Sequence, residues 1–123
     1  MEAAPAGLLR QQGFKPAVLS RGYGGTNRKG TNIVADGRSI LSTPEKAGDE
    51  PFLIARALGD VPVLTDPDRF AAGALALATL GTDIIVLDDG FQHRKLYRDI
   101  SIALLDSERP FGNGCLIPRG SLR

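Results

Sequence analysis

Four short runs of apolar residues along the chain predict buried β-strands. They lie at residues 14–19, 61–64, 83–87 and 100–105. Continuous apolar runs are typical of strands that a parallel sheet covers on both faces. The third run therefore predicts a central strand that is buried on both faces. A weaker pattern at 32–35 and 39–41 flanks the turn dipeptide Asp36-Gly37 and predicts a hairpin.

Apolar residues at helical spacing predict three helices: at 2–12, from Asp49 for about ten residues, and at 69–80. Asp49 and Asp66 each precede a proline in a predicted first turn, and both are predicted to be N-caps. Residues 43–48 are predicted to form a loop. The alternation of strands and helices indicates right-handed crossovers and an α/β fold with three layers, α/β/α, around a mostly parallel sheet.

Two carboxylates, Asp88 and Asp89, follow the third strand directly. Ligands of open α/β sheets bind at the carboxyl ends of the strands, and phosphate-transferring folds hold Mg²⁺ with a strand-end aspartate. Adjacent carboxylates also repel each other, so a divalent cation would stabilise the pair. The alternative is that both are turn residues before Gly90.

Other charged residues are predicted at the same edge of the sheet. Arg21 follows the first strand, where it would meet anionic groups. Asp49 and Glu50 place two negative charges at the tip of a helix that faces this edge, although capping alone explains Asp49. His93 is the only histidine and lies four residues after Asp89; a hydrogen-bonded structural role is the alternative to a functional one.

A glycine-rich segment, 20–31, follows the first strand, as a phosphate-binding loop would. A dinucleotide fingerprint needs a third glycine at the position of Asn27, and a P-loop needs Gly-Lys-Ser/Thr, whereas here Lys29 precedes Gly30. Neither motif is present. A mobile loop with basic residues is the alternative beyond Gly25.

Composition narrows the classes of function. The chain has 123 residues, enough for one domain, and its formal net charge of +1 gives no reason to expect a nucleic-acid partner. A single cysteine, Cys115, excludes an internal disulfide. The longest apolar stretch, 71–80, contains Gly73 and is much shorter than the roughly 20 residues of a membrane span.

Five motifs follow one another along nearly the whole chain. They are Ser20-Arg21-Gly22-Tyr23-Gly24-Gly25, Gly48-Asp49-Glu50-Pro51, Asp88-Asp89-Gly90-Phe91-Gln92-His93, Arg98-Asp99-Ile100, and Phe111-Gly112-Asn113-Gly114 with Leu116-Ile117-Pro118-Arg119-Gly120-Ser121-Leu122-Arg123. Together, in this order and spacing, they closely resemble the tetraacyldisaccharide 4'-kinase family of the lipid A pathway in Gram-negative bacteria.

This resemblance implies a P-loop NTPase-like fold and an ATP-dependent phosphotransferase. With Mg²⁺, the family moves the γ-phosphate of ATP to the 4' hydroxyl of tetraacyldisaccharide 1-phosphate during lipopolysaccharide biosynthesis. The implied partner is this lipid A precursor, with no nucleic acid. The implied location is cytoplasmic, peripheral at the cytoplasmic face of the inner membrane in the full-length family.

The resemblance also implies roles for individual residues. The implied catalytic residues are Asp49, which would activate the sugar hydroxyl, Asp89 and His93. The implied metal ligands are Glu50, Asp88 and Asp89, and the implied cofactor-binding residues are Glu50, Asp88 and Arg21. The implied substrate-binding residues are Arg21, Gly22, Tyr23, Gln92 and Arg123.

The family has further segments outside the range 1–123: a P-loop before the first helix and a smaller domain at the other end. The resemblance therefore implies that residues 1–123 form a partial kinase catalytic domain, with little or no kinase activity by itself and with marginal stability. Two other functions stay open: a non-catalytic α/β domain that binds Mg²⁺ or an anionic glycolipid, and a P-loop-type nucleotide hydrolase.

Overall fold

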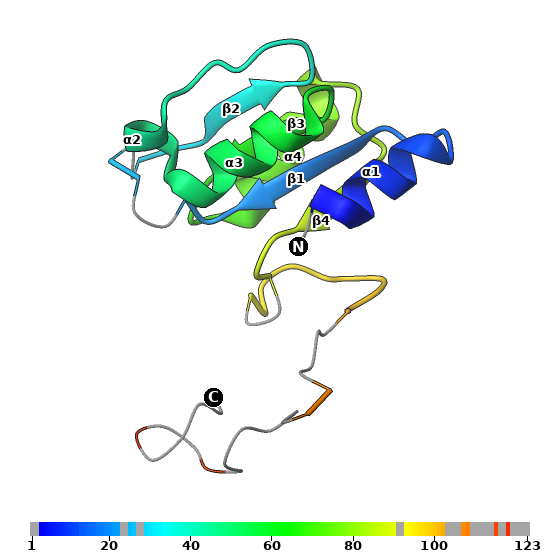
Figure 1. Cartoon of the computed structure of the whole chain (residues 1–123), viewed down its shortest axis with the longest axis vertical. Coiled ribbons are helices and arrows are strands. Elements are labelled where there is room, and N and C mark those ends of the chain that lie inside the picture. The colour runs from blue at the N-terminus through cyan, green and yellow to red at the C-terminus, as the bar shows by residue number, and fades with distance from the viewer. Residues whose placement is uncertain are drawn as a thin grey trace.

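The computed structural model describes residues 3–22, 25–26, 29–90, 93–102, 107–108, 115 and 118. Four helices and four strands follow one another within these residues (Figure 1). They are α1 (Ala3–Gln11), β1 (Pro16–Ser20), β2 (Asn32–Asp36), α2 (Pro44–Ala47), α3 (Asp49–Leu58), β3 (Pro62–Thr65), α4 (Arg69–Thr79) and β4 (Ile84–Leu87).

The four strands form one mixed sheet in the order β2-β3-β1-β4. β1 pairs in parallel with both β3 and β4, so that Val18 lies between Val63 and Val86. β2 is antiparallel to β3 and lies at the edge of the sheet. The predicted mostly parallel sheet is therefore confirmed, and the carboxyl ends of β1, β3 and β4 meet at one edge.

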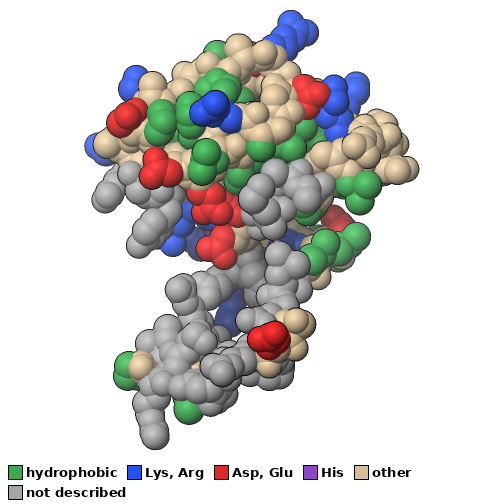
Figure 2. Space-filling view, viewed as in Figure 1, with side chains coloured by type: hydrophobic (Ala, Val, Ile, Leu, Met, Phe, Trp, Pro, Cys, Tyr) green, Lys and Arg blue, Asp and Glu red, His purple; other side chains and the backbone are tan. Residues whose placement is uncertain are grey.

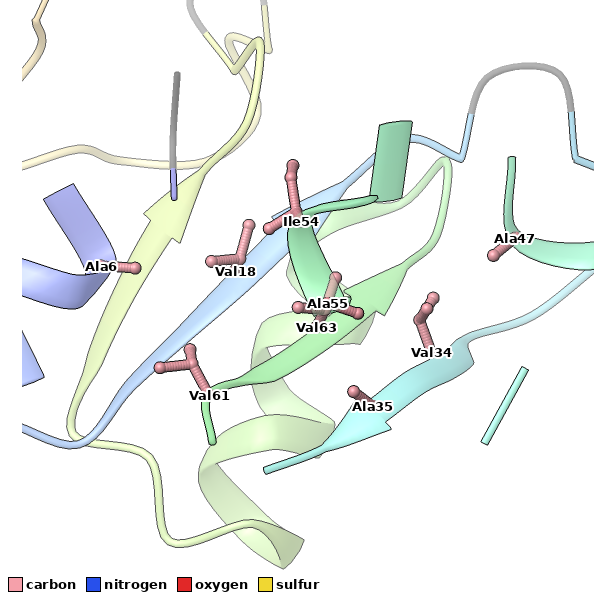
Figure 3. Packing of buried hydrophobic residues seen from close by; sticks show 9 residues of the cluster. All are labelled: Ala6, Val18, Val34, Ala35, Ala47, Ile54, Ala55, Val61 and Val63. Carbon is pink, nitrogen blue, oxygen red and sulfur yellow. The ribbon is translucent and has the colours of Figure 1, made fainter. Parts of the chain in front are cut away.

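Helices cover both faces of this sheet, which confirms the predicted three layers (Figure 1). On one face, α1 and α3 bury Ala6, Ile54 and Ala55 against Val18 and other strand residues; Figure 3 shows these side chains directed toward one another. On the other face, Ala72 and Ala76 of α4 pack against a second group of strand side chains, Ala17, Leu19 and Leu64. Small alanines let the helices approach the sheet closely.

The structure differs from the predictions made for residues 43–48, for Asp49 and for the third apolar run. Residues 43–48 are not all loop, because 44–47 form α2. Asp49 is the first residue of α3 rather than its cap: Gly48 occupies the cap position, with φ 94°, and no side chain caps this helix. β4 is half-buried along its whole length rather than buried on both faces, because β1 is its only neighbour in the described sheet.

The predicted hairpin is present only in part. β2 forms its first arm, and the second arm is reduced to a bridge between Ala35 and Ile40. In the turn between them, the Asp36 carboxylate accepts hydrogen bonds from the backbone N–H groups of Ser39 and Arg38. These two bonds hold the pKa of Asp36 below its ordinary value of 3.8, because they favour the charged form.

The strand predicted at 100–105 is absent at 100–102, and 103–106 lie outside the described residues. Among the described helices, none has the length and apolar character needed to cross a membrane.

Candidate functional site

The ends of β3 and β4 flank the end of β1. The backbone N–H of Asp66, just after β3, donates to the carbonyl of Ser20 over 3.0 Å, and that of Asp88, just after β4, donates to the carbonyl of Leu19 over 2.8 Å. Asp66 and Asp88 thus lie on either side of the end of β1, which Arg21 follows directly. This is the edge at which open α/β sheets bind ligands.

Asp66 has a different role from the one predicted. Its buried carboxylate accepts a hydrogen bond of 2.6 Å from the Thr31 hydroxyl and one of 2.8 Å from the N–H of Asp68. The N-cap of α4 is Asp68, which accepts from the N–H groups of Phe70 and Ala71. The prediction that Asp66 caps this helix is therefore wrong by two residues. Its side chain instead joins the loop after β1 to the end of β3.

Arg69 was missed by the sequence reasoning. Its side chain is only 4% exposed, and Nη2 donates to the main-chain carbonyl of Asp88 over 3.2 Å. Nε has no partner among the described residues. Burial lowers the pKa of Arg69, and the charge of Arg21 lowers it further, whereas Asp88 and Asp89 raise it. An arginine stays charged even so, and a buried positive charge therefore lies beside the acidic pair.

A signal for Arg69 exists in the sequence. It is the first residue of α4, and the remaining ten residues of that helix carry no charge. A cation at a helix N-terminus opposes the helix dipole, so a lone arginine in that position needs a compensating reason. Here the reason is the contact with the end of β4.

The acidic pair itself has two different environments. Asp88 is 3% exposed, whereas Asp89 is exposed and has a φ of 49°, in the left-handed region. The backbone turns sharply here: a Cβ on Gly90 would lie 2.5 Å from the Cβ of Leu87. The turn thus presents one carboxylate to solvent and keeps the other beside Arg69.

The second acidic pair, Asp49 and Glu50, lies at the same edge of the sheet. Both are exposed in the first turn of α3, which starts two residues after Ala47. The Ala47 carbonyl oxygen is 3.5 Å from the position of a Cβ on Gly22, just after β1. Together with the parallel direction of β3, this contact puts the start of α3 beside the strand ends.

The two acidic pairs do not form one cluster. α3 packs over β3 and β2, whereas Asp88 follows β4. In the sheet, β3 lies two strand spacings of about 4.8 Å from β4, across β1, and β2 lies three spacings from it. In the described part of the chain, no three His, Cys, Asp or Glu residues are placed to hold one metal ion. The three implied metal ligands, Glu50, Asp88 and Asp89, are therefore not gathered around a common point.

The other predicted site residues are placed as follows. Arg21 is exposed at the end of β1, and Gly22 has a φ of 75° against Thr65. His93 is half-buried, its Nε2 has no partner among the described residues, and its backbone N–H donates to the Gly90 carbonyl over 3.0 Å. Tyr23, Gln92 and Arg123 lie outside the described residues.

Acidic side chains lie close together where the sheet and its helices meet the segment that follows β4 (Figure 2). An open pocket of about 210 Å³ lies at the opposite edge of the sheet, beside the starts of β1 and β3, and it is lined by Lys15, Asp60 and Pro62 among others. The charged edge therefore consists of strand ends and loops, and that pocket is separate from it.

Known proteins similar to this chain share one description. A tetraacyldisaccharide 4'-kinase of Syntrophus aciditrophicus is 58% identical over 118 residues, which cover 96% of this chain and 32% of the relative. The enzyme of the same description from Geobacter sulfurreducens is 46% identical over 123 residues, 100% of this chain and 35% of the relative. The chain thus spans about a third of the length of these relatives.

A solved structure and a family model also match this chain. A crystal structure described as the "apo" form of LpxK from Aquifex aeolicus in complex with ATP matches with a TM-score of 0.86 and 39% identity. The match covers 99% of this chain and 38% of that one. The family model described as tetraacyldisaccharide-1-P 4'-kinase matches residues 3–123. The chain therefore belongs to the tetraacyldisaccharide-1-P 4'-kinase family.

Proposed function

We propose that this chain supplies part of the catalytic edge of an ATP-dependent kinase that phosphorylates the 4' hydroxyl of tetraacyldisaccharide 1-phosphate in lipid A biosynthesis. The proposal rests on one observation: two acidic pairs and two arginines lie along the same edge of a sheet in a chain of this family. Phosphoryl transfer depends on such positioning and on compensation of charge.

The acidic pair after β4 is proposed to handle the metal. Asp88 and Asp89 supply adjacent carboxylates, and this donor set fits Mg²⁺, which commonly takes one or two carboxylates together with water and substrate phosphates rather than a closed protein cage. Mg²⁺, when bound, would neutralise negative charge on phosphate oxygens. Arg69 offsets part of the charge of the pair and holds the backbone of Asp88 in place.

The acidic pair of α3 is proposed to face the acceptor. Asp49 is exposed at the start of the helix, where its carboxylate is accessible to accept the proton of the sugar hydroxyl. Glu50 is proposed to act beside it rather than as a third ligand of the same ion. The exposed Arg21, between the two acidic pairs along the edge, would bind anionic oxygens of the substrates.

His93 is proposed to act in the same loop as Asp89, as a group that moves or holds a proton. Its half-buried ring, with Nε2 unpartnered among the described residues, supports this role. Tyr23, Gln92 and Arg123 remain proposed substrate contacts on the basis of family membership. The proposed partner is the lipid A precursor at the cytoplasmic face of the inner membrane, without nucleic acid.

Binding of ATP to the 123-residue chain, measured by titration calorimetry with and without Mg²⁺, tests the metal role. We expect Asp88→Asn and Asp89→Asn to weaken Mg²⁺-dependent binding at least about tenfold, since interactions with charged groups contribute about 1.5–3 kcal/mol. Asp99→Asn, the same change at an exposed aspartate, serves as the control. Equal Mg²⁺-dependent affinity in all four proteins would contradict the proposal.

The reaction is tested with the protein purified from its own organism. Radiolabelled γ-phosphate should move from ATP to tetraacyldisaccharide 1-phosphate, and ATP consumption should depend on this acceptor. Rapid hydrolysis of ATP that does not change when the acceptor is added would instead support a nucleotide hydrolase.

A further inference from the structure

Arg98 donates hydrogen bonds to two main-chain carbonyls just after the acidic pair, those of Gly90 and His93. Its Nη1 donates to the carbonyl of Gly90 over 2.5 Å and to that of His93 over 3.2 Å. Arg98 lies eight residues beyond Gly90 and is itself half-buried. These contacts are made by the arginine of the Arg98-Asp99-Ile100 motif, to which the proposed reaction assigns no role.

The loop that Arg98 contacts has an unusual backbone. Asp89 is the one residue other than glycine with a positive φ in the described part of the chain. Such a conformation is less favourable than a right-handed one for a residue with a Cβ, although aspartate adopts it more readily than most residues, and surrounding contacts help to hold it.

Two arginines bond to the backbone carbonyls that precede and follow Asp89 in the sequence. Arg69 donates to the Asp88 carbonyl, just before the left-handed residue, and Arg98 donates to the Gly90 carbonyl, just after it. The Gly90 carbonyl also accepts from the backbone N–H of His93. Hydrogen bonds from arginine side chains therefore hold the backbone carbonyls of both sequence neighbours of Asp89, Asp88 and Gly90.

We propose that Arg98 is a positioning residue: through the carbonyls of Gly90 and His93, it keeps Asp89 in its left-handed conformation and so directs the Asp89 carboxylate and the His93 ring at the edge of the sheet. It acts through the backbone and is not itself catalytic. An arginine suits this role, because a planar guanidinium carries several donors in a rigid arrangement, whereas a lysine is a single, strongly hydrated charge. The function of the directed carboxylate rests on the kinase proposal above.

Hydrogen exchange of individual backbone amides tests how firmly the loop is held. In Arg98→Gln we expect the His93 amide, which bonds to Gly90, to exchange about tenfold faster, the loss typical of a charge-assisted hydrogen bond. Arg98→Lys keeps the charge and should restore only part of the protection. The exposed Arg94 provides the matched control, and Arg94→Gln should leave the His93 amide unchanged.

Faster exchange confined to the His93 amide would distinguish a positioning role of Arg98 from a general contribution to the stability of the fold. Amides of β1, such as those of Val18 and Leu19, should exchange at the same rate in all variants. An unchanged His93 amide in Arg98→Gln would overturn the proposal. Equal acceleration at His93 and throughout β1 would overturn it too, because Arg98 would then stabilise the whole fold and not this loop.

A second experiment tests whether Arg98 positions the Asp89 carboxylate. It measures the affinity for Mn²⁺ from the paramagnetic broadening of the Asp88 and Asp89 amide signals. We expect about tenfold weaker binding in Arg98→Gln, as is typical when a residue that supports a metal ligand is lost. Unchanged Mn²⁺ affinity together with faster exchange at His93 would overturn the positioning of the carboxylate. If the unaltered chain does not bind Mn²⁺ at all, the metal role proposed for the kinase fails, and hydrogen exchange still decides whether Arg98 holds the loop.

Discussion

Gly22 and Gly25 allow the turn after β1 to pack closely against its neighbours. A Cβ at Gly22 would lie 3.0 Å from the Cβ of Thr65, and one at Gly25 would overlap the carbonyl oxygen of Lys46 in α2. The space at Gly25 is thus already filled by other atoms, whereas a Cβ at Gly22 would make a tight contact that Thr65 would have to relieve. Close packing explains Gly25, and the left-handed backbone together with the tight contact explains Gly22, so a phosphate-binding loop is not needed to account for either glycine.

Substitution of Gly25 by alanine tests this packing. We expect Gly25→Ala to lower the free energy of unfolding by about 1–3 kcal/mol, the usual cost of overpacking, because α2 or the turn must move. Gly7→Ala, in α1, is the control. Its Cβ would make an ordinary 3.9 Å contact with Leu58, and loss of a helix glycine should stabilise by about 0.5–1 kcal/mol.

Urea unfolding followed by circular dichroism measures both changes. Equal stability of Gly25→Ala and the unaltered chain would show that the turn has room for a side chain, and the glycine would then need another explanation.

At the scale of elements, α3 and α4 begin in different ways. The first N–H groups of α4 are bound by the Asp68 side chain, whereas α3 starts after Gly48 without a side-chain cap. Asp49 is therefore not needed to satisfy its own helix, and its carboxylate is exposed at the edge of the sheet. This difference leaves Asp49 available for chemistry, in agreement with its proposed role.

The cap of α4 should contribute measurably to stability. Asp68→Ala removes the acceptor of two backbone N–H groups, and we expect it to lower the free energy of unfolding by about 1 kcal/mol. Asp68→Asn keeps a capping oxygen and should differ by less than about 0.5 kcal/mol. If chemical denaturation finds the two variants equally stable, the cap contributes nothing through its hydrogen bonds.

At the scale of the whole molecule, α4 leaves large apolar side chains on its outer face. Phe70 is 64% exposed and Leu77 is 56% exposed, seven positions apart and so on one side of the helix. The alanines that pack on the sheet lie on the opposite side. Large apolar side chains exposed on one face of a helix favour association with another apolar surface.

We therefore expect the 123-residue chain to self-associate as its concentration rises. A Phe70→Ser/Leu77→Ser double variant should stay monomeric in sedimentation velocity experiments. Its free energy of unfolding should change by about 1 kcal/mol at most, because both side chains are exposed. Ala78→Ser, an exposed neighbour on the same helix, is the control. A monomeric unaltered chain at every concentration would contradict this expectation.

The elements of the fold were largely predictable, because periodicity is a local property. The apolar runs located β1, β3 and β4 to within two residues, and the helical spacing located α1, α3 and α4. The helix starts were less predictable: Asp49, Asp66 and Asp68 are all suitable caps, and choosing among them depends on other partners. Asp66 bonds to Thr31, a contact across 35 residues that no local pattern contains.

The order of strands and helices, the three layers and the acidic pair after β4 could all be inferred from the amino-acid sequence, since each follows from the polarity of neighbouring positions. Three features became visible only in the folded chain: the burial of Arg69 beside that pair, the position of β4 at the edge of the described sheet, and the separation of Glu50 from Asp88 and Asp89. These features depend on which strands are neighbours in the sheet, because that packing sets the distances between residues that are far apart in the chain.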